Sequence, residues 1–94
     1  MKNTISSKEL ETFLENYSVI IIDVRSEQEY REGHLNGAIN IPLFEIRRKI
    51  SNMEINKSQL IVVYCSAGIR SMKALNILNS LGYKNVYNYV YSYE

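Results

Sequence analysis

The only cysteine of the chain, Cys65, occupies a place in the sequence where a thiol can act as a nucleophile. It follows an apolar, β-branched run over residues 60–64 and precedes a short segment that leads into helical periodicity over residues 72–81. The free amide N–H groups in the first turn of a helix favour an anion, so they lower the pKa of a nearby thiol. A lone cysteine is usually a small buried hydrophobe, but the strand end, Gly68 and Arg70 favour covalent chemistry on sulfur.

Three charged residues lie where they could support such chemistry. Arg70 begins the helix after the cysteine, and its planar guanidinium could bind an anion or form an ion pair with Asp23 or Glu29. Asp23 follows the apolar run 19–22, so it could orient the loop amides or Arg70, or else cap a turn. We expect Arg25 to pair with Glu29 or another carboxylate rather than to contact a substrate.

Alternating strands and helices must position these residues. Continuous apolar runs without polar alternation are typical of strands that helices cover on both faces. Capping-box spacing at residues 6–9 and 26–29 predicts two helix starts. The sequence predicts strands at residues 3–5, 19–22, 38–41, 60–64 and from 86, and helices after residue 6 and over 27–32, 44–50 and 72–81.

This order of elements predicts an α/β fold with a central, mainly parallel sheet of about five strands and helices on both faces. Ligands of parallel sheets gather at the carboxyl ends of the strands, which here carry Asp23 and Cys65. Tyrosines at positions 87, 89, 91 and 93 would share one face of the last strand. That face either packs on the domain or belongs to an edge that pairs with another chain.

Length and composition suit a single domain over residues 1–94, with one core and no internal disulfide. No secretory leader or apolar run of about 18 residues is present, so we expect a soluble cytoplasmic protein without a membrane partner. The formal net charge of +1 gives no general attraction to nucleic acid. One cysteine and one histidine are too few for a metal-ligand set, so we expect no metal site, and we expect no cofactor. The single histidine, His34, is expected to hold the geometry of a turn.

Four segments of the sequence resemble the single-domain rhodanese family, and the resemblance runs from about residue 4 to residue 86. The segments are Ile22-Asp23-Val24-Arg25 with Glu29-Tyr30, the stretch GHLNGAINIP at 33–42, the stretch VYCSAGIRS at 63–71, and Leu81-Gly82-Tyr83. Each segment alone is weak, but their order and spacing together are specific.

The resemblance implies a rhodanese-like fold and a sulfurtransferase in which Cys65 is the nucleophile and the persulfide carrier. It implies thiosulfate, a polysulfide or a protein persulfide as the donor, and cyanide, glutathione or a thiol protein as the acceptor. Backbone amides of the loop would bind the anionic sulfur. The loop consists of Ser66, Ala67, Gly68, Ile69, Arg70 and Ser71, with Asp23 and Arg25 in supporting roles.

Two other functions remain open at the level of sequence. One is a rhodanese-like binding or sensing module in which Cys65 accepts sulfur or an oxidant without turnover. The other is a cysteine-dependent phosphatase or arsenate reductase. Such phosphatases have five residues between cysteine and arginine, whereas four residues, 66–69, separate Cys65 from Arg70. The shorter loop forms a tighter ring, which suits one sulfur atom better than a tetrahedral phosphate.

Overall fold

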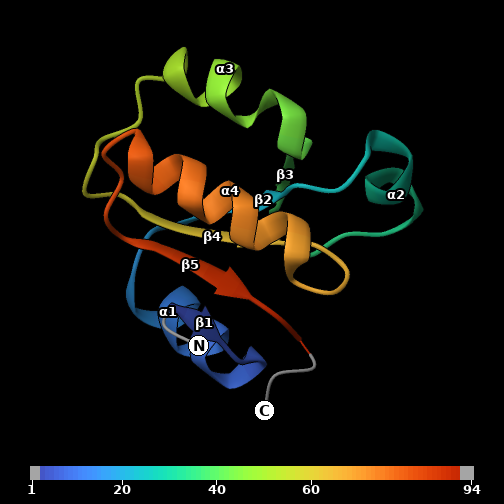
Figure 1. Cartoon of the computed structure of the whole chain (residues 1–94). Coiled ribbons are helices and arrows are strands. Elements are labelled where there is room, and N and C mark those ends of the chain that lie inside the picture. The colour runs from blue at the N-terminus through green and yellow to red at the C-terminus, as the bar shows by residue number, and fades with distance from the viewer. Residues whose placement is uncertain (1–2, 92–94) are drawn as a thin grey trace.

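A computed structural model describes residues 3–91 and shows a five-stranded sheet between layers of helices (Figure 1). Neighbouring strands run parallel, in the order β1-β5-β4-β2-β3. The strands are β1 (Thr4–Ile5), β2 (Val19–Asp23), β3 (Ile39–Asn40), β4 (Leu60–Tyr64) and β5 (Val86–Tyr89). The helices are α1 (Ser7–Asn16), α2 (Glu27–Glu32), the 3-10 turn η1 (Leu43–Glu45), α3 (Ile46–Ser51) and α4 (Ile69–Ser80). The expected α/β fold is confirmed.

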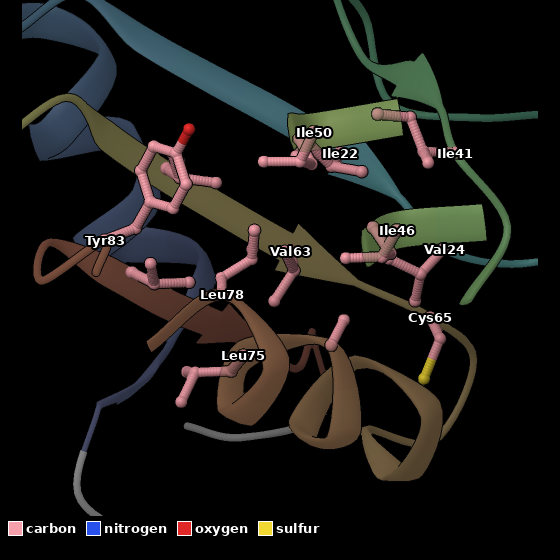
Figure 2. Packing of buried hydrophobic residues seen from close by; sticks show 13 residues of the cluster. Ile22, Val24, Ile41, Ile46, Ile50, Val63, Cys65, Leu75, Leu78 and Tyr83 are labelled. Atoms are coloured by element: carbon pink, nitrogen blue, oxygen red, sulfur yellow. The ribbon is translucent and has the colours of Figure 1, made fainter. Parts of the chain in front are cut away.

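The two central strands carry side chains into two separate cores. Ile22 and Val63 belong to the core under α3 and α4, which Figure 2 shows from close by. Ile21 and Val62 belong to the core on the opposite face, where α1 contributes Leu10. Both faces of β2 and β4 are therefore buried, which explains why their sequences lack polar alternation.

Local hydrogen bonds fix where the first two helices begin. The Ser6 side chain accepts the Glu9 N–H, and the Glu9 carboxylate accepts the Ser6 N–H. Ser26 and Glu29 form the same reciprocal pair at the start of α2. Both capping boxes predicted from the sequence are therefore present.

The larger differences from the sequence-based expectation lie at the third strand, at the helix after it and at the start of α4. The third strand covers only Ile39–Asn40 rather than residues 38–41, and the helical spacing over 44–50 divides into η1 and α3. Helix α4 begins at Ile69, three residues before the expected start at residue 72. Apolar periodicity does not mark this first turn, because the Ile69 side chain is 68% exposed.

The C-terminal tyrosines belong to an interior strand. β5 lies between β1 and β4, so the alternative of an edge strand that pairs with another chain is wrong for residues 86–89. The Tyr87 ring contacts Phe13, and the Tyr89 hydroxyl is 2.8 Å from the Ser7 hydroxyl. Tyr91 is exposed, and Tyr93 lies outside the described residues. Two of the four tyrosines thus pack on the domain.

Candidate active site

Cys65 follows β4 directly and lies at one end of the larger core, beside the first turn of α4 (Figure 2). Cys65 is only 6% exposed. The pairing of β2 with β4 places Asp23 opposite Tyr64, the residue before the cysteine. The carboxyl ends of these two neighbouring strands therefore meet where the sequence predicted a site.

Backbone N–H groups of the loop converge on the cysteine sulfur. The amides of Gly68 and Ser71 donate to Sγ at 3.2 and 3.3 Å, and the Ser71 hydroxyl is 3.3 Å from Sγ. Burial raises the pKa of the Cys65 thiol, but hydrogen bonds from Ser71 and the loop amides, Ala67 included, outweigh burial and lower the pKa below its ordinary value. The loop thus favours a sulfur anion.

Among the remaining loop residues, three are exposed to solvent and Gly68 packs against the segment that follows β5. The exposed residues are Ser66, Ala67 and Ile69. Gly68 has φ +90°, and a Cβ at this position would come within 2.9 Å of Val90 Cγ2. Glycine therefore suits both the left-handed backbone and the close approach of the segment after β5.

Arg70 forms an ion pair with Glu29 in α2. Its Nη1 and Nη2 donate to the two carboxylate oxygens at 2.8 and 3.1 Å, and Nη2 makes a long 3.5 Å contact with Ser66 Oγ. The hydrogen bonds from Arg70 and the helix cap lower the pKa of Glu29 to about 2. The same pair raises the pKa of Arg70. The charge of Arg70 is thus compensated within the chain.

Asp23 makes no hydrogen bond to the loop amides or Arg70; instead its Oδ1 accepts the Arg25 N–H at 2.9 Å, which fits the turn-capping alternative. Its fully buried carboxylate accepts from Arg25 Nε at 3.0 Å and Nη2 at 2.7 Å, and from the Tyr64 hydroxyl at 2.7 Å. Burial raises the Asp23 pKa, but the hydrogen bonds from Arg25 and Tyr64 outweigh burial and lower it overall. Asp23 binds Arg25 and Tyr64 because Arg25 lies two residues further along the chain and Tyr64 is the register partner of Asp23 in β4.

Tyr64 and His34 brace the wall of the site. The Tyr64 hydroxyl accepts the Leu35 N–H at 3.0 Å, and burial is the main cause that raises the pKa of Tyr64 to about 12. The His34 ring stacks on Tyr30 with 3.6 Å between centroids, and its Nδ1 is 2.8 Å from the Tyr30 carbonyl oxygen. This geometry agrees with the turn-holding role expected for His34.

A cavity of about 490 Å³ opens beside the sulfur. Its walls are mostly aromatic or apolar, with Arg25 as a charged member. They comprise Arg25, Gly33, His34, Leu35, Tyr64, Cys65, Ser66, Tyr89 and Tyr91. Cys65 itself lines this cavity, so a small molecule bound there would lie next to the residue that carries the thiol.

The sequence analysis missed Asn88, which is 1% exposed in β5. Its Oδ1 accepts the Ser71 hydroxyl at 2.5 Å, and its Nδ2 donates to the Gly68 carbonyl at 3.2 Å. Asn88 thereby contacts both residues whose amides bind Sγ. The sequence does mark this residue, because asparagine is depleted in strands and Asn88 lies within an aromatic and β-branched strand.

The part of the chain that the structure describes holds neither a metal-binding cluster nor a membrane-spanning helix. Among residues 3–91, no group of three or more His, Cys, Asp or Glu side chains is arranged to hold a metal ion. None of the helices in that range is both long and apolar enough to cross a membrane. The amide donors around Sγ and the adjoining cavity are what make Cys65 the candidate site.

Comparison with known proteins matches this arrangement to one family. The model of the family described as rhodanese-like domain matches residues 6–94. Thiosulfate sulfurtransferase PspE of Escherichia coli is 43% identical over 67 residues, which cover 71% of this chain and 64% of that protein. A tRNA uridine(34) hydroxylase of Buchnera aphidicola is 34% identical over 87 residues, which cover 88% of this chain and 28% of that protein.

The solved structures that superpose on this chain include members of the same family. The human single-domain sulfurtransferase TSTD1 superposes with a TM-score of 0.83 at 28% identity, covering 98% of this chain and 94% of that one. A rhodanese with anions from E. coli superposes with a TM-score of 0.71 at 41% identity, covering 76% of this chain and 84% of that one. The chain spans less than two thirds of the first curated relatives, at 64%, 28% and 61% of their lengths.

Proposed function

The chain belongs to the rhodanese-like domain family, and from this premise we propose that it is a sulfurtransferase that carries sulfane sulfur as a persulfide on Cys65. The donor is thiosulfate, a polysulfide or a protein persulfide, and the acceptor is cyanide, glutathione or a thiol protein. One observation carries the proposal: N–H groups of Gly68 and Ser71 converge on a buried thiol that borders a cavity.

Sulfur uptake begins with attack of the Cys65 thiolate on the outer sulfur of the donor. A new S–S bond forms at Sγ while the bond between that sulfur and the rest of the donor breaks. With thiosulfate, the electron pair of the broken bond leaves with sulfite. The loop amides stabilise the attacking thiolate and the negative charge on the terminal sulfur, and their fixed dipoles need no reorganisation.

In sulfur release, the bond between Sγ and the terminal sulfur breaks again, and Sγ keeps the electron pair. The acceptor attacks the terminal sulfur, Sγ leaves as a thiolate, and cyanide becomes thiocyanate or a thiolate becomes a hydropersulfide. A lower thiol pKa makes Sγ a better leaving group. The hydrogen bonds that lower the pKa of Cys65 therefore assist both half-reactions.

The charges around the site favour donors of low charge. Arg25 is bound to Asp23 and Arg70 to Glu29, so each guanidinium is already compensated by a carboxylate. A thiosulfate dianion gains less from such pairs than from unpaired cations. We therefore expect an uncharged organic trisulfide to load Cys65 faster than thiosulfate does.

Intact-mass spectrometry tests this function directly. After incubation with thiosulfate or an organic trisulfide, the protein should gain the mass of one sulfur atom, and cyanide should remove it. A Cys65→Ser variant serves as the control, and an adduct on this variant would overturn the assignment of the nucleophile. Loading that no acceptor discharges would instead support the non-turnover sensing module.

A second substrate addresses the phosphatase alternative. Because the ring closed by four residues between Cys65 and Arg70 suits a single sulfur atom, we expect no hydrolysis of p-nitrophenyl phosphate under conditions that support sulfur transfer. Hydrolysis by the unmodified protein that Cys65→Ser abolishes would contradict the argument from loop length.

A further inference from the structure

The hydroxyl group of Ser71 lies between two groups that compete for it. Ser71 Oγ is 3.3 Å from Cys65 Sγ and 2.5 Å from Asn88 Oδ1. The three residues are buried, with exposures of 6% for Cys65, 0% for Ser71 and 1% for Asn88. Because Nδ2 of Asn88 donates to the Gly68 carbonyl, the amide turns its oxygen toward Ser71.

The Ser71 hydroxyl cannot donate a full hydrogen bond to both of its neighbours at once. A serine hydroxyl carries one proton and can donate only one full hydrogen bond. While Cys65 is a thiol, its S–H can donate to Ser71 Oγ, and Ser71 can donate to Asn88, so every group is satisfied. Once Cys65 is a thiolate, Ser71 can serve either the sulfur or Asn88, and one of these buried acceptors loses a donor.

We propose that Asn88 is a positioning residue that competes with the Cys65 sulfur for the hydroxyl proton of Ser71. It thereby sets how strongly the Ser71 hydroxyl stabilises the anionic sulfur, in addition to the hydrogen bonds from the backbone amides of Gly68 and Ser71. The inference concerns the nucleophile of the proposed function and rests on that function only for its effect on sulfur transfer.

The other titratable groups near the sulfur do not take part in this competition. Arg70 faces the sulfur from α4, and Glu29 of α2 pairs with it. The cavity wall adds Arg25, His34, Tyr64, Tyr89 and Tyr91. Among the described residues, the partners of the Asn88 side chain are Ser71 and Gly68, so substitution of Asn88 removes no hydrogen bond from these groups.

A double-mutant cycle on the thiol pKa tests the proposal. The variants are Asn88→Leu, Ser71→Ala and their combination, and the readout is the pH dependence of alkylation by iodoacetamide. Loss of the bond to the Gly68 carbonyl occurs in both backgrounds and cancels from the cycle. With Ser71 present, Asn88→Leu frees the hydroxyl, so the thiolate-to-thiol ratio should rise about tenfold relative to its change in the Ser71→Ala background.

Equal shifts in the two backgrounds would overturn the proposal and leave Asn88 as a purely structural clamp. If Asn88→Leu does not fold, Asn88→Asp takes its place in the same cycle: the carboxylate binds the Ser71 hydroxyl more strongly, so it should raise the thiol pKa more with Ser71 present than in the Ser71→Ala background. A pKa shift in the opposite direction would likewise contradict the competition.

Asn85→Leu is a matched control, because Asn85 bonds the Ser58 carbonyl away from the loop and its loss should leave the thiol pKa unchanged. The cycle reports on the thiol itself, so it stands even if no sulfur adduct forms. Conversely, a sulfur adduct on the wild-type protein together with a zero coupling would retain the proposed function and reject the role of Asn88.

Discussion

Peptide N–H groups, rather than an uncompensated positive charge, bind the Cys65 sulfur. The amides of Gly68 and Ser71 reach Sγ, whereas the guanidinium groups of Arg25 and Arg70 are bound to carboxylates. Salt screens exposed charges more strongly than buried dipoles. The thiol pKa should therefore depend little on ionic strength.

The Asp23–Arg25 pair is the charged contact whose loss should cost most. We expect Arg25→Met to destabilise the fold by about 3 kcal/mol, because it leaves a fully buried carboxylate without its cation. Urea denaturation at pH 7 measures this loss. Arg31→Met removes one partner of the exposed Arg31–Glu27 pair and should cost less than about 0.5 kcal/mol. Equal losses would show that burial does not set the cost.

The Glu29–Arg70 pair should contribute a small, pH-dependent stability. The pKa of Glu29 is depressed from 4.5 to about 2, so its contribution is fully present above the unfolded value and is lost as pH falls toward about 2. Both side chains are about a third exposed, which limits the contribution to less than about 1 kcal/mol.

Denaturation midpoints of the wild type and Glu29→Gln measure this contribution at several pH values, since glutamine keeps the capping acceptor but not the charge. The difference between the two proteins should shrink between pH 4.5 and pH 2. A difference that grows over this range would mean that the pair is not formed.

At the scale of elements, the site depends on how α4 is attached to the sheet. The loop after β4 is held from one side by the first turn of α4 and from the other by β5, through Asn88 and the approach of Val90 to Gly68. A helix start alone would supply free amides. The contact with β5 fixes where those amides point.

Replacing Gly68 with alanine tests that contact. We expect Gly68→Ala to raise the thiol pKa and slow sulfur loading, because the left-handed backbone is strained and the new Cβ meets Val90 at 2.9 Å. The stability loss should exceed that of Gly37→Ala by about 1 kcal/mol, since Gly37 has φ +84° but no atom near its Cβ position.

A Val90→Ala change combined with Gly68→Ala should recover the part of the loss that comes from the steric contact. Thiol titration and urea denaturation provide the two readouts. Absence of any recovery would assign the whole effect to backbone strain at Gly68.

At the scale of the whole molecule, β2 and β4 connect the two cores and carry the site at their common end. They pair over five residues each, whereas β1 and β3 contribute two residues each. Residues on one face of these strands support α3 and α4, and residues on the other face support α1. Stability and site geometry therefore depend on the same two strands.

A cavity in this central pair should destabilise the whole fold. Ile22 is fully buried, so Ile22→Ala should cost about 2–5 kcal/mol, a large share of the total stability of a domain of this size. Its register partner Ile39 is 38% exposed, and Ile39→Ala should cost less than about 1 kcal/mol. Similar losses for both variants in urea denaturation would contradict the view that β2 is central.

Short-range patterns in the sequence predicted most of the elements and pointed to Cys65 as the candidate nucleophile. Capping boxes act within four residues, and continuous apolar runs report burial on both faces, so α1, α2, β2 and β4 were predicted closely. The strand end at Cys65 and Gly68 likewise marked the loop without knowledge of distant contacts. The bounds of the strand at residues 38–41 were missed because Ala38 and Ile41 are buried without belonging to the strand, and the start of α4 was missed because Ile69 is exposed.

Tertiary structure alone decided which side chains meet around the sulfur. The strand order brings β5 next to β4, so Asn88 reaches Ser71 across 17 residues of sequence, and Arg70 reaches Glu29 across 41. Asp23 could have paired with Arg70, but the register of β2 with β4 places it beside Tyr64. Strand order and register depend on the packing of the whole sheet, and no local pattern of residues encodes them.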